Sequence, residues 1–316
     1  MATSVTTDRP LRDDSGRARL PDISDVAVSP DGVRIAYDVY GSGDLTLIFL
    51  PSAPIIHSRQ WKGQVPYFAR SHRVVTYDGR GNGRSDRPTD PAAYHDDRFV
   101  EDLVSVMEAT GTDAAVLIGL CVDGVWRSIR LASEQPERVR GIVAFAVGVP
   151  RLSPPQPHYV AAGATFDDEL PTRDGWAKYN RHHWEREYGD FARFFFEQMT
   201  TEPHSTKATE DAAGWAMDGS VEAMLAEAAV EFPFDRHAIE DICRSVRCPM
   251  LLVHGTDDQC QPIDRAHRLR ELTGAPLVVV DGANHMIPGR HPVLANLLIR
   301  DFVRSLKEGK DRHDDL

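Results

Sequence analysis

Short apolar runs recur along the chain, separated by longer stretches in which apolar residues follow a helical spacing. Runs of this kind, apolar on both faces, are typical of parallel strands that are covered by helices on both sides. They occupy residues 45–50, 73–77, 115–118, 141–146, 250–254 and 276–280. The pattern predicts an α/β fold with a mostly parallel sheet flanked by helices.

Two β-type segments precede these runs, at residues 25–28 and 33–37. Pro30, Asp31 and Gly32 lie between them and are turn formers. We therefore expect an opening hairpin that gives the sheet an antiparallel edge.

The strand pattern stops between residue 148 and about residue 239. This stretch opens with several prolines and continues with aromatic-rich helical segments at residues 176–188 and 191–199. A separate helical domain is one interpretation, but the strand pattern that resumes at Met250 favours a helical cap inserted over the strand ends, where open α/β sheets bind ligands. The predicted division is a flexible segment at 1–21, a core at 22–148 and 240–306, a cap insert at 149–239, and a flexible tail at 307–316.

Charge and cysteine content narrow the class of protein. The 316 residues carry a formal net charge of -12, which disfavours nucleic acid or an anionic membrane surface as a partner. The sequence has neither an apolar run long enough to span a bilayer nor the apolar stretch of a secretory signal near its start. Four cysteines in a chain of this length form no disulfide framework, so we expect a cytoplasmic protein whose thiols are to be judged for reactivity.

Cys121 stands where a predicted strand runs through a tight turn directly into a predicted helix. This is the context of a nucleophile elbow, in which the side chain projects from the corner. The backbone N–H of Val122 would face a developing oxyanion, and the helix N-terminus would stabilise a thiolate. The alternative is a small buried apolar residue at a strand end.

With these residues the sequence resembles the α/β-hydrolase family, from about Val26 to Val303. That family commonly has Gly-x-Ser-x-Gly-Gly at the elbow, and this chain has Gly119, Cys121, Asp123 and Gly124 in the same register. Cysteine in place of serine is similar to dienelactone hydrolases and some thioesterase-like members. Asp123 stands where the family has a glycine, a position that lies at the elbow and at the entrance of the expected pocket.

The resemblance implies two further catalytic residues. Asp258 lies three residues after Gly255 and four before Pro262, which is the family's register for the acid and selects Asp258 over Asp257. His285 follows the last predicted strand, where the family has its general base, and the order Cys, Asp, His is the family's order. A solvated turn and a surface histidine are the alternatives.

The loop after residues 45–50 is expected to complete the oxyanion hole. The resemblance makes Ala53 the second N–H donor, with Ser52 and His57 lining the site, whereas Pro54 has no N–H to donate. The glycine-rich segment 78–88 lacks the lysine of a phosphate-binding loop and is interpreted as structural, with Arg80 either ion-paired or solvated.

Metal and cofactor sites are not predicted. The spacing of Cys243, Cys248 and Cys260 with His254 fits no common zinc pattern. Cys260, two residues past the predicted acid, is expected on the same face as Cys121, where reversible pairing of the two is an open alternative.

The sequence therefore predicts a hydrolase of an ester, lactone or thioester that forms a thioester intermediate on Cys121. An acyltransferase that uses the same intermediate and a non-catalytic ligand receptor are the alternatives. Trp184 and other cap aromatics favour an apolar or aromatic small-molecule substrate, or else pack the insert's own core. The oligomeric state stays open.

Overall fold

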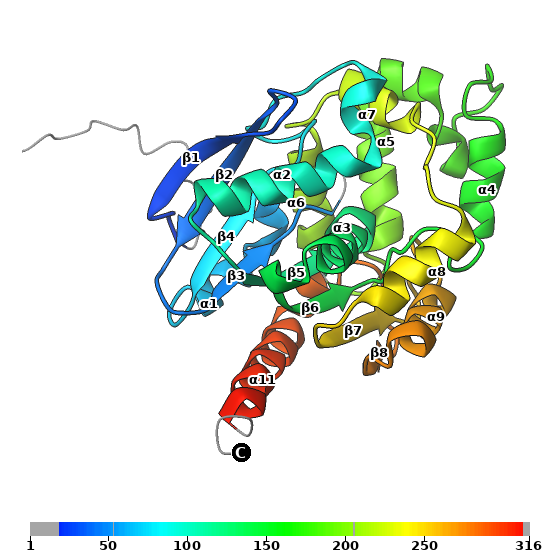
Figure 1. Ribbon diagram of the computed structural model, residues 1–316. Coiled ribbons are helices and arrows are strands. Elements are labelled where there is room, and N and C mark those ends of the chain that lie inside the picture. The colour runs from blue at the N-terminus through cyan, green and yellow to red at the C-terminus, as the bar shows by residue number, and fades with distance from the viewer. Residues whose placement is uncertain (1–18, 53, 205, 312–316) are drawn as a thin grey trace, which may run out of the picture.

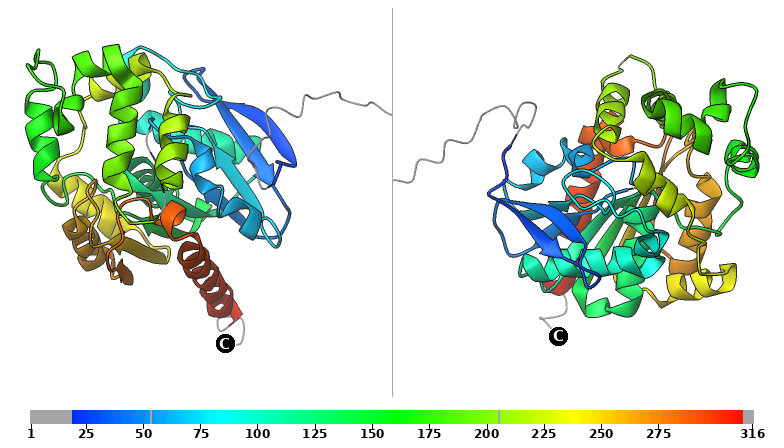
Figure 2. Two further views of the ribbon diagram at one scale, coloured as in Figure 1. Left: turned by 180° about the vertical axis from the view of Figure 1, so that it is seen from behind. Right: turned by 90° about the horizontal axis from the view of Figure 1, so that it is seen from above.

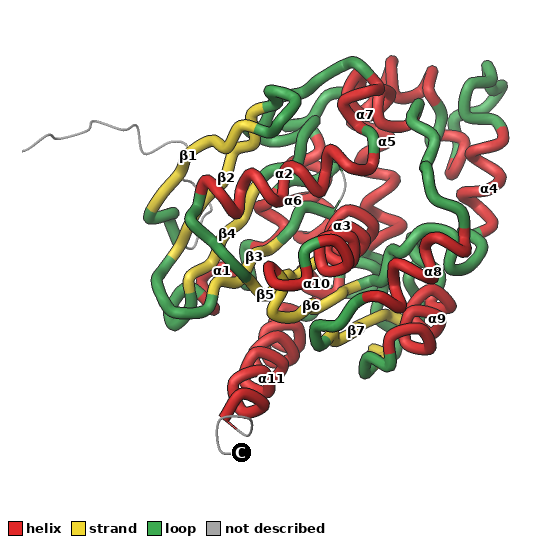
Figure 3. Tube along the Cα trace, in the orientation of Figure 1, coloured by secondary structure: helices red, strands yellow, loops and turns green. Residues whose placement is uncertain are grey.

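An eight-stranded sheet forms the centre of the molecule (Figures 1 and 3). The computed structural model describes residues 19–52, 54–204 and 206–311, with side chains described up to residue 307. In the order of the sheet the strands are β1 (Ile23–Val28), β2 (Arg34–Tyr40), β4 (Arg73–Tyr77), β3 (Thr46–Phe49), β5 (Ala115–Leu120), β6 (Val139–Phe145), β7 (Met250–Gly255) and β8 (Leu277–Val280).

The strand directions confirm the predicted fold class. β1 pairs with β2 and β2 with β4 in antiparallel fashion, as expected for the hairpin edge. The remaining neighbours are parallel, so that β3 to β8 end at the same edge of the sheet. The side chains that follow these strands are therefore brought together at that edge.

Helices bury both faces of the sheet, which explains why the central strands are apolar throughout. One face carries α2 (Asp96–Ala109), α3 (Cys121–Glu134), α8 (Arg236–Ser245) and α9 (Ile263–Thr273). The other carries α1 (Val65–Phe68), α10 (Ile287–Arg290) and α11 (Pro292–Asp311). Short 3-10 turns complete the core at Ser58–Trp61, Pro91–Tyr94 and Pro136–Arg138.

The chain between β6 and β7 is helical. It contains α4 (Pro157–Ala164), a 3-10 turn (Gly175–Lys178), α5 (Arg181–Met199), α6 (Lys207–Ala216) and α7 (Val221–Ala228). α5 is interrupted at Glu187, whose backbone leaves the helical region. Figures 1 and 2 show these helices at one end of the molecule and α11 at the other.

Two sequence-based boundaries fall inside helices. The cap was expected to end at residue 239, which lies within α8, and α8 packs on α3 and α9 of the core. The predicted tail begins at residue 307, but α11 continues to Asp311. Most of the predicted N-terminal segment and the last five residues lie outside the described part of the chain. None of the described helices is long and apolar enough to cross a bilayer.

Candidate active site

The turn between β5 and α3 has the geometry of a strained elbow. Cys121 adopts a φ of 60°, a left-handed conformation that is costly for a residue with a side chain and that recurs at functional sites. Gly119 and Gly124 make the turn possible, since a Cβ on Gly119 would lie 2.3 Å from the carbonyl carbon of Gly124. The Asp123 side chain turns toward Arg127, so the aspartate does not prevent the turn from closing.

The end of β6 approaches the same elbow. A Cβ on Gly148 would lie 2.4 Å from the backbone nitrogen of Val122, so only glycine fits there. The N–H of Asp123 donates to the carbonyl of Ser52 over 3.4 Å, which joins the elbow to the loop after β3. Ala53, the other predicted oxyanion donor, lies outside the described residues.

The loops after β7 and β8 bring Asp258 and His285 together. Gly255 permits the approach, because a Cβ there would meet the carbonyl oxygen of Ala283 at 2.1 Å. Nδ1 of His285 then lies 2.9 Å and 3.1 Å from the two carboxylate oxygens of Asp258. The backbone N–H groups of Cys260 and Gln261 donate to Oδ1 of Asp258, over 2.7 and 2.8 Å, and fix its orientation.

His254, at the end of β7, acts as a buried structural anchor for this loop. Its Nδ1 accepts a hydrogen bond from the N–H of Val147 at 3.0 Å. Nε2 therefore carries the proton and donates to the carbonyl of Gln261 at 3.0 Å. The two bonds tie the acid-bearing loop to the end of β6.

A second sulfur lies beside Cys121. The Sγ atoms of Cys121 and Cys260 and a ring nitrogen of His285 all lie within 4.8 Å of one another. Since Nδ1 faces Asp258, Nε2 is the nitrogen left to face the thiols. We call Cys121, Asp258, Cys260 and His285 the dithiol site.

The four groups of the dithiol site shift one another's pKa values. A hydrogen bond to Cys260, together with burial, raises the pKa of the Cys121 thiol. The hydrogen bond from Cys121 and then the charge of His285 lower the pKa of the Cys260 thiol well below its usual range, against the effect of burial. Burial opposes the charged imidazole, but Asp258 and Cys260 outweigh it and raise the pKa of His285. These shifts favour negative charge on Cys260 over Cys121 and stabilise the charged form of His285.

Asp258 remains ionised in this arrangement. Burial alone would raise the pKa of its carboxyl, but the charge of His285 and the hydrogen bonds that it accepts lower the pKa below the usual value. A stable carboxylate is what holds an imidazole in one orientation during proton transfer.

A cavity of about 510 Å³ opens onto both sulfurs. Three of the four residues predicted for the substrate pocket line it: Ser52, Asp123 and Trp184. Several aromatic residues of the helical segment between β6 and β7 also face the cavity, among them Tyr159, Tyr179, Phe191 and Phe195, whereas Trp176, Tyr188, Phe194 and Phe196 do not. The aromatic residues of this segment thus divide between lining the cavity and packing the segment itself.

The cavity wall also carries carboxyl groups. Burial raises the pKa of Asp123 to about 6, although Arg127 opposes the shift. Burial and the neighbouring charge of Asp123 raise the pKa of Glu227 to about 8. At neutral pH Glu227 is therefore mainly a neutral acid that can donate a hydrogen bond into the cavity.

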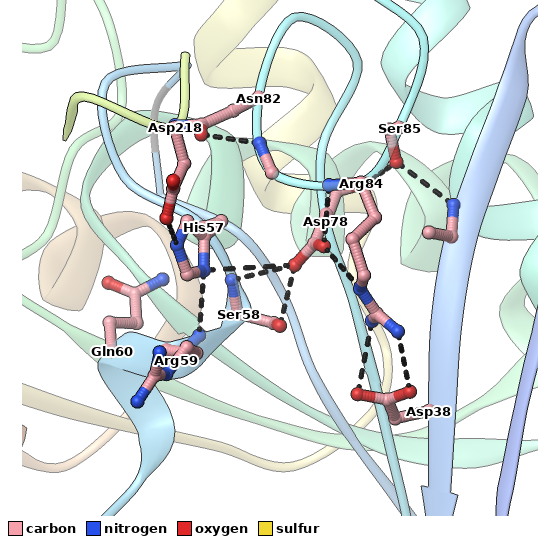
Figure 4. A network of polar contacts seen from close by, with 12 residues as sticks. Asp38, His57, Ser58, Arg59, Gln60, Asp78, Asn82, Arg84, Ser85 and Asp218 are labelled. Carbon is pink, nitrogen blue, oxygen red and sulfur yellow. Dashed lines mark hydrogen bonds and ion pairs between the residues drawn. The ribbon is translucent and has the colours of Figure 1, made fainter. Parts of the chain in front are cut away.

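The fourth residue predicted for the pocket, His57, lies elsewhere, which corrects its sequence-based placement. Nδ1 of the ring accepts a hydrogen bond from the backbone N–H of Arg59. Nε2 lies 3.1 Å from Oδ2 of Asp218 (Figure 4). His57 belongs to a group that we call the Asp78 cluster, which consists of the buried residues Asp38, His57, Ser58 and Asp78 and the more exposed Arg84. The capping of the 3-10 turn after His57 fixes the ring away from the cavity.

A larger cavity, of about 1160 Å³, lies at the other end of the sheet. Thr46, Arg73 and Val139, the first residues of three strands, line it, and none of the predicted site residues does. Open parallel sheets bind their substrates at the carboxyl ends of the strands. We therefore place the candidate site in the smaller cavity.

Gln261, Arg265 and Asn284 were missed by the sequence analysis. Nε2 of Gln261 donates to Cys121 and Cys260, and Arg265 donates to its Oε1. Asn284 accepts the N–H of His285 and donates to the carbonyl of Gln198 in the insert. Their positions near the predicted acid and base were the available signal, but the contacts of Gln261 with Cys121 and of Asn284 with Gln198 join distant parts of the sequence.

The two sulfurs and the imidazole are also groups that bind soft metal ions. The N–H donors of Gln261 point at both sulfurs, and Arg265 adds a positive charge behind them. These groups oppose a bound cation and stabilise a thiolate. We therefore interpret the site through thiol chemistry.

In a comparison with known protein families, residues 46–292 match the alpha/beta hydrolase fold family. A non-heme chloroperoxidase of Streptomyces lividans is 28% identical over 288 residues, which cover 87% of this chain and 98% of that protein. A bifunctional esterase/perhydrolase of Acinetobacter calcoaceticus is 24% identical, with 87% and 98% covered. The structure of a putative aryl esterase from Burkholderia cenocepacia superposes with a TM-score of 0.75 at 19% identity, over 90% of this chain and 100% of that one.

Proposed function

The chain belongs to the α/β-hydrolase fold family, and we propose that it is an enzyme that cleaves an ester, lactone or thioester through an acyl intermediate on Cys121. The observation that carries the proposal is the placement of Cys121 on a strained elbow, with a φ of 60°, at the floor of the cavity. The esterase names of relatives support the same reaction class.

In the proposed cycle the Cys121 sulfur attacks the substrate carbonyl. Its proton passes to His285, a ring nitrogen of which lies within 4.8 Å of the Cys121 sulfur. The N–H of Val122 and the N-terminus of α3 stabilise the tetrahedral oxyanion. His285 then donates a proton to the leaving group, and a water molecule releases the acyl group from the thioester.

The aromatic wall of the cavity favours a substrate with an apolar or aromatic portion. Trp184 is buried, and its indole N–H has no hydrogen-bond partner among the described residues. Buried indole N–H groups usually have an acceptor.

The test is detection of the acyl-enzyme by intact mass after mixing with a panel of p-nitrophenyl esters, lactones and acyl thioesters. Cys121→Ala should abolish both the mass increase and the burst of p-nitrophenol. Cys248→Ala is the matched control, because Cys248 lies away from the cavity lining and should acylate as the wild type does. Full turnover by Cys121→Ala would remove Cys121 from the mechanism.

The same experiment separates hydrolysis from acyl transfer, since a thioester reacts with amines and thiols as well as with water. Product partition is measured with an added amine or thiol acceptor. We expect water to be the main acceptor. A dominant transfer product would favour an acyltransferase, and a wild type that forms no acyl-enzyme with any member of the panel would favour a ligand receptor.

A further inference from the structure

Cys260 gives the site a chemistry that ester hydrolysis does not require. Its sulfur lies within 4.8 Å of the Cys121 sulfur and of a His285 ring nitrogen. It stands two residues after Asp258, on the loop between β7 and α9, and is only partly buried. Two thiols that share one cavity and one imidazole can react with each other as well as with a substrate.

The side chain of Gln261 bridges the two sulfurs. Its Nε2 lies 3.4 Å from the Cys121 sulfur and 3.5 Å from the Cys260 sulfur. Arg265 fixes which end of the amide faces the thiols: a guanidinium has only donors, so Oε1 must face Arg265 and the NH₂ group must face the sulfurs. The buried guanidinium of Arg265 therefore holds the NH₂ group of Gln261 toward the sulfurs, where it can donate a hydrogen bond to a thiolate.

Cys260 has a further donor from the insert. The hydroxyl of Tyr159 in α4 donates to its sulfur over 3.5 Å. Together with Gln261 and the imidazolium of His285, this surrounds the Cys260 sulfur with groups that favour the thiolate. Low-pKa, accessible cysteines next to a second cysteine are the ones that oxidants select.

The other two cysteines provide an internal contrast. Burial raises the pKa of Cys243 to about 12 and that of Cys248 to about 11. Neither lines the cavity that contains Cys121 and Cys260. They should therefore remain protonated and react slowly under conditions in which Cys260 is a thiolate.

We propose that Cys121 and Cys260 form a reactive dithiol that a peroxide converts into an intramolecular disulfide, with Cys260 the sulfur that attacks the peroxide. The reaction goes beyond ester hydrolysis, because it depends on the two sulfurs and their donors and not on an acyl substrate. It adds a modification site, and a thiol-dependent capacity to reduce peroxides, to the proposed hydrolase site.

The Cys260 thiolate attacks one oxygen of hydrogen peroxide or an organic hydroperoxide, an S–O bond forms, and the O–O bond breaks. The departing hydroxide or alkoxide takes the proton of the His285 imidazolium. The Cys121 sulfur then attacks the sulfenic sulfur, the S–S bond forms, and hydroxide leaves as water with the Cys121 proton. The two sulfurs lose two electrons and the peroxide gains them, and an external dithiol returns the protein to its starting state.

The test treats the full chain with one equivalent of hydrogen peroxide in the presence of a metal chelator, followed by alkylation of the remaining thiols and mass spectrometry. We expect a mass loss of about 2 Da before alkylation, two fewer alkylatable thiols, and reversal by dithiothreitol. Trypsin should yield a linked pair of residues 99–127 and 248–265. The second peptide contains Cys248 and Cys260, so fragmentation must place the link on Cys260.

Three variants sharpen the result. Cys121→Ser should stop at a sulfenic acid on Cys260 that dimedone traps, whereas Cys260→Ser should react with peroxide at least about tenfold more slowly. Cys248→Ser is the matched control and should form the disulfide as the wild type does. Retention of all four thiols by the wild type, or a link that disappears in Cys248→Ser, would overturn the proposal. Acyl-enzyme formation is measured separately on the reduced protein, so that failure of the disulfide and failure of the hydrolase mechanism are distinguishable.

Discussion

Two buried polar groups lie at the same edge of the sheet, and they differ in how their charges are compensated. In the Asp78 cluster, Oδ1 of Asp78 accepts the N–H and the hydroxyl of Ser58, and Oδ2 accepts the N–H and Nε of Arg84 (Figure 4). Although burial alone would raise the pKa of Asp78, the charge of Arg84 lowers it, so the carboxylate holds no proton near neutral pH. This cluster is a closed structural unit.

In the dithiol site a proton is shared between sulfurs that face a cavity. The pKa of Cys121 is raised and that of Cys260 is lowered. The proton of Cys121 is therefore stabilised by the negative charge that the site favours on Cys260. Burial is similar for Asp78 and Cys121 themselves, which are 2% and 7% exposed. Burial alone therefore does not make a group reactive. A proton that can move between groups beside an open cavity does.

The largest expected effect is that of Asp258→Asn. The N–H groups of Cys260 and Gln261 would keep the amide oxygen of the asparagine on their side, so its NH₂ would face Nδ1 of His285 and impose the wrong tautomer. We expect the acylation rate to fall on the order of 10⁴-fold, measured by stopped-flow release of p-nitrophenol. Circular dichroism confirms the fold, and a rate within tenfold of the wild type would contradict the assignment of Asp258.

Asp78→Asn should affect stability instead of chemistry. The amide would place a donor against donors from Ser58 or Arg84 and leave the charge of Arg84 less compensated. We expect a loss of about 3 kcal/mol in the free energy of unfolding, measured by urea denaturation. Acylation per folded molecule should stay within about threefold of the wild type, and a loss of activity without a loss of stability would break the contrast between the two regions.

Gln261→Glu should weaken thiol reactivity. The new carboxylate would still pair with Arg265, but it would replace a donor to the sulfurs by a negative charge and raise the pKa of Cys260. Because the native pKa is lowered, the wild-type thiolate persists as the pH falls below the ordinary thiol range and is lost only when the pH falls through that lowered value. We expect alkylation of Cys260 by iodoacetamide at pH 7 to slow by about 10- to 100-fold.

The groups that face Cys260 in that experiment are Cys121, Tyr159, Asp258 and His285, and all remain in the variant. The matched control is Gln259→Glu, which adds the same charge two residues away on an exposed side chain that bonds to the carbonyl of Asp257. An equal slowing in both variants would show a general charge effect and remove Gln261 from its positioning role.

Asp218→Asn should have the smallest effect. Burial lowers the pKa of His57, so near pH 7 a neutral imidazole donates the hydrogen bond to Asp218, and an asparagine oxygen can accept it as well. The Asp218 side chain is more than half exposed. We expect a change below about 1 kcal/mol in the free energy of unfolding, measured by urea denaturation beside Asp78→Asn. A loss of unfolding free energy as large as that of Asp78→Asn would show that the His57–Asp218 pair stabilises the cluster as much as Asp78 does.

The sequence predicted the fold to a large extent because the signals were local. The six apolar runs and the opening hairpin correspond to strands β1 to β8, each within a few residues. The predicted boundaries at residues 239 and 307 fall inside α8 and α11, which continue through them. Helix ends of this kind depend on which core surface the helix covers.

The loop after β3 shows where local reasoning fails. Ser52 lines the cavity as predicted from its position after the strand, but His57 caps a 3-10 turn and faces Asp78 and Asp218. Arg80, for which the sequence left a solvated loop open, is buried and paired with Asp31 and Asp102. Partners more than twenty residues away decide both side chains.

By itself the sequence determined the α/β fold and the strand ends that carry Cys121, Asp258 and His285. Hydrophobic periodicity and turn residues are properties of neighbouring positions, and parallel strands necessarily present their carboxyl ends at one edge. Only the tertiary structure decided that the Cys260 sulfur lies within 4.8 Å of the other sulfur and of the imidazole, and that Gln261 and Arg265 hold a donor against both thiols. Proton positions depend on distances of a few ångströms between loops far apart in the chain, and no spacing along the sequence encodes those distances.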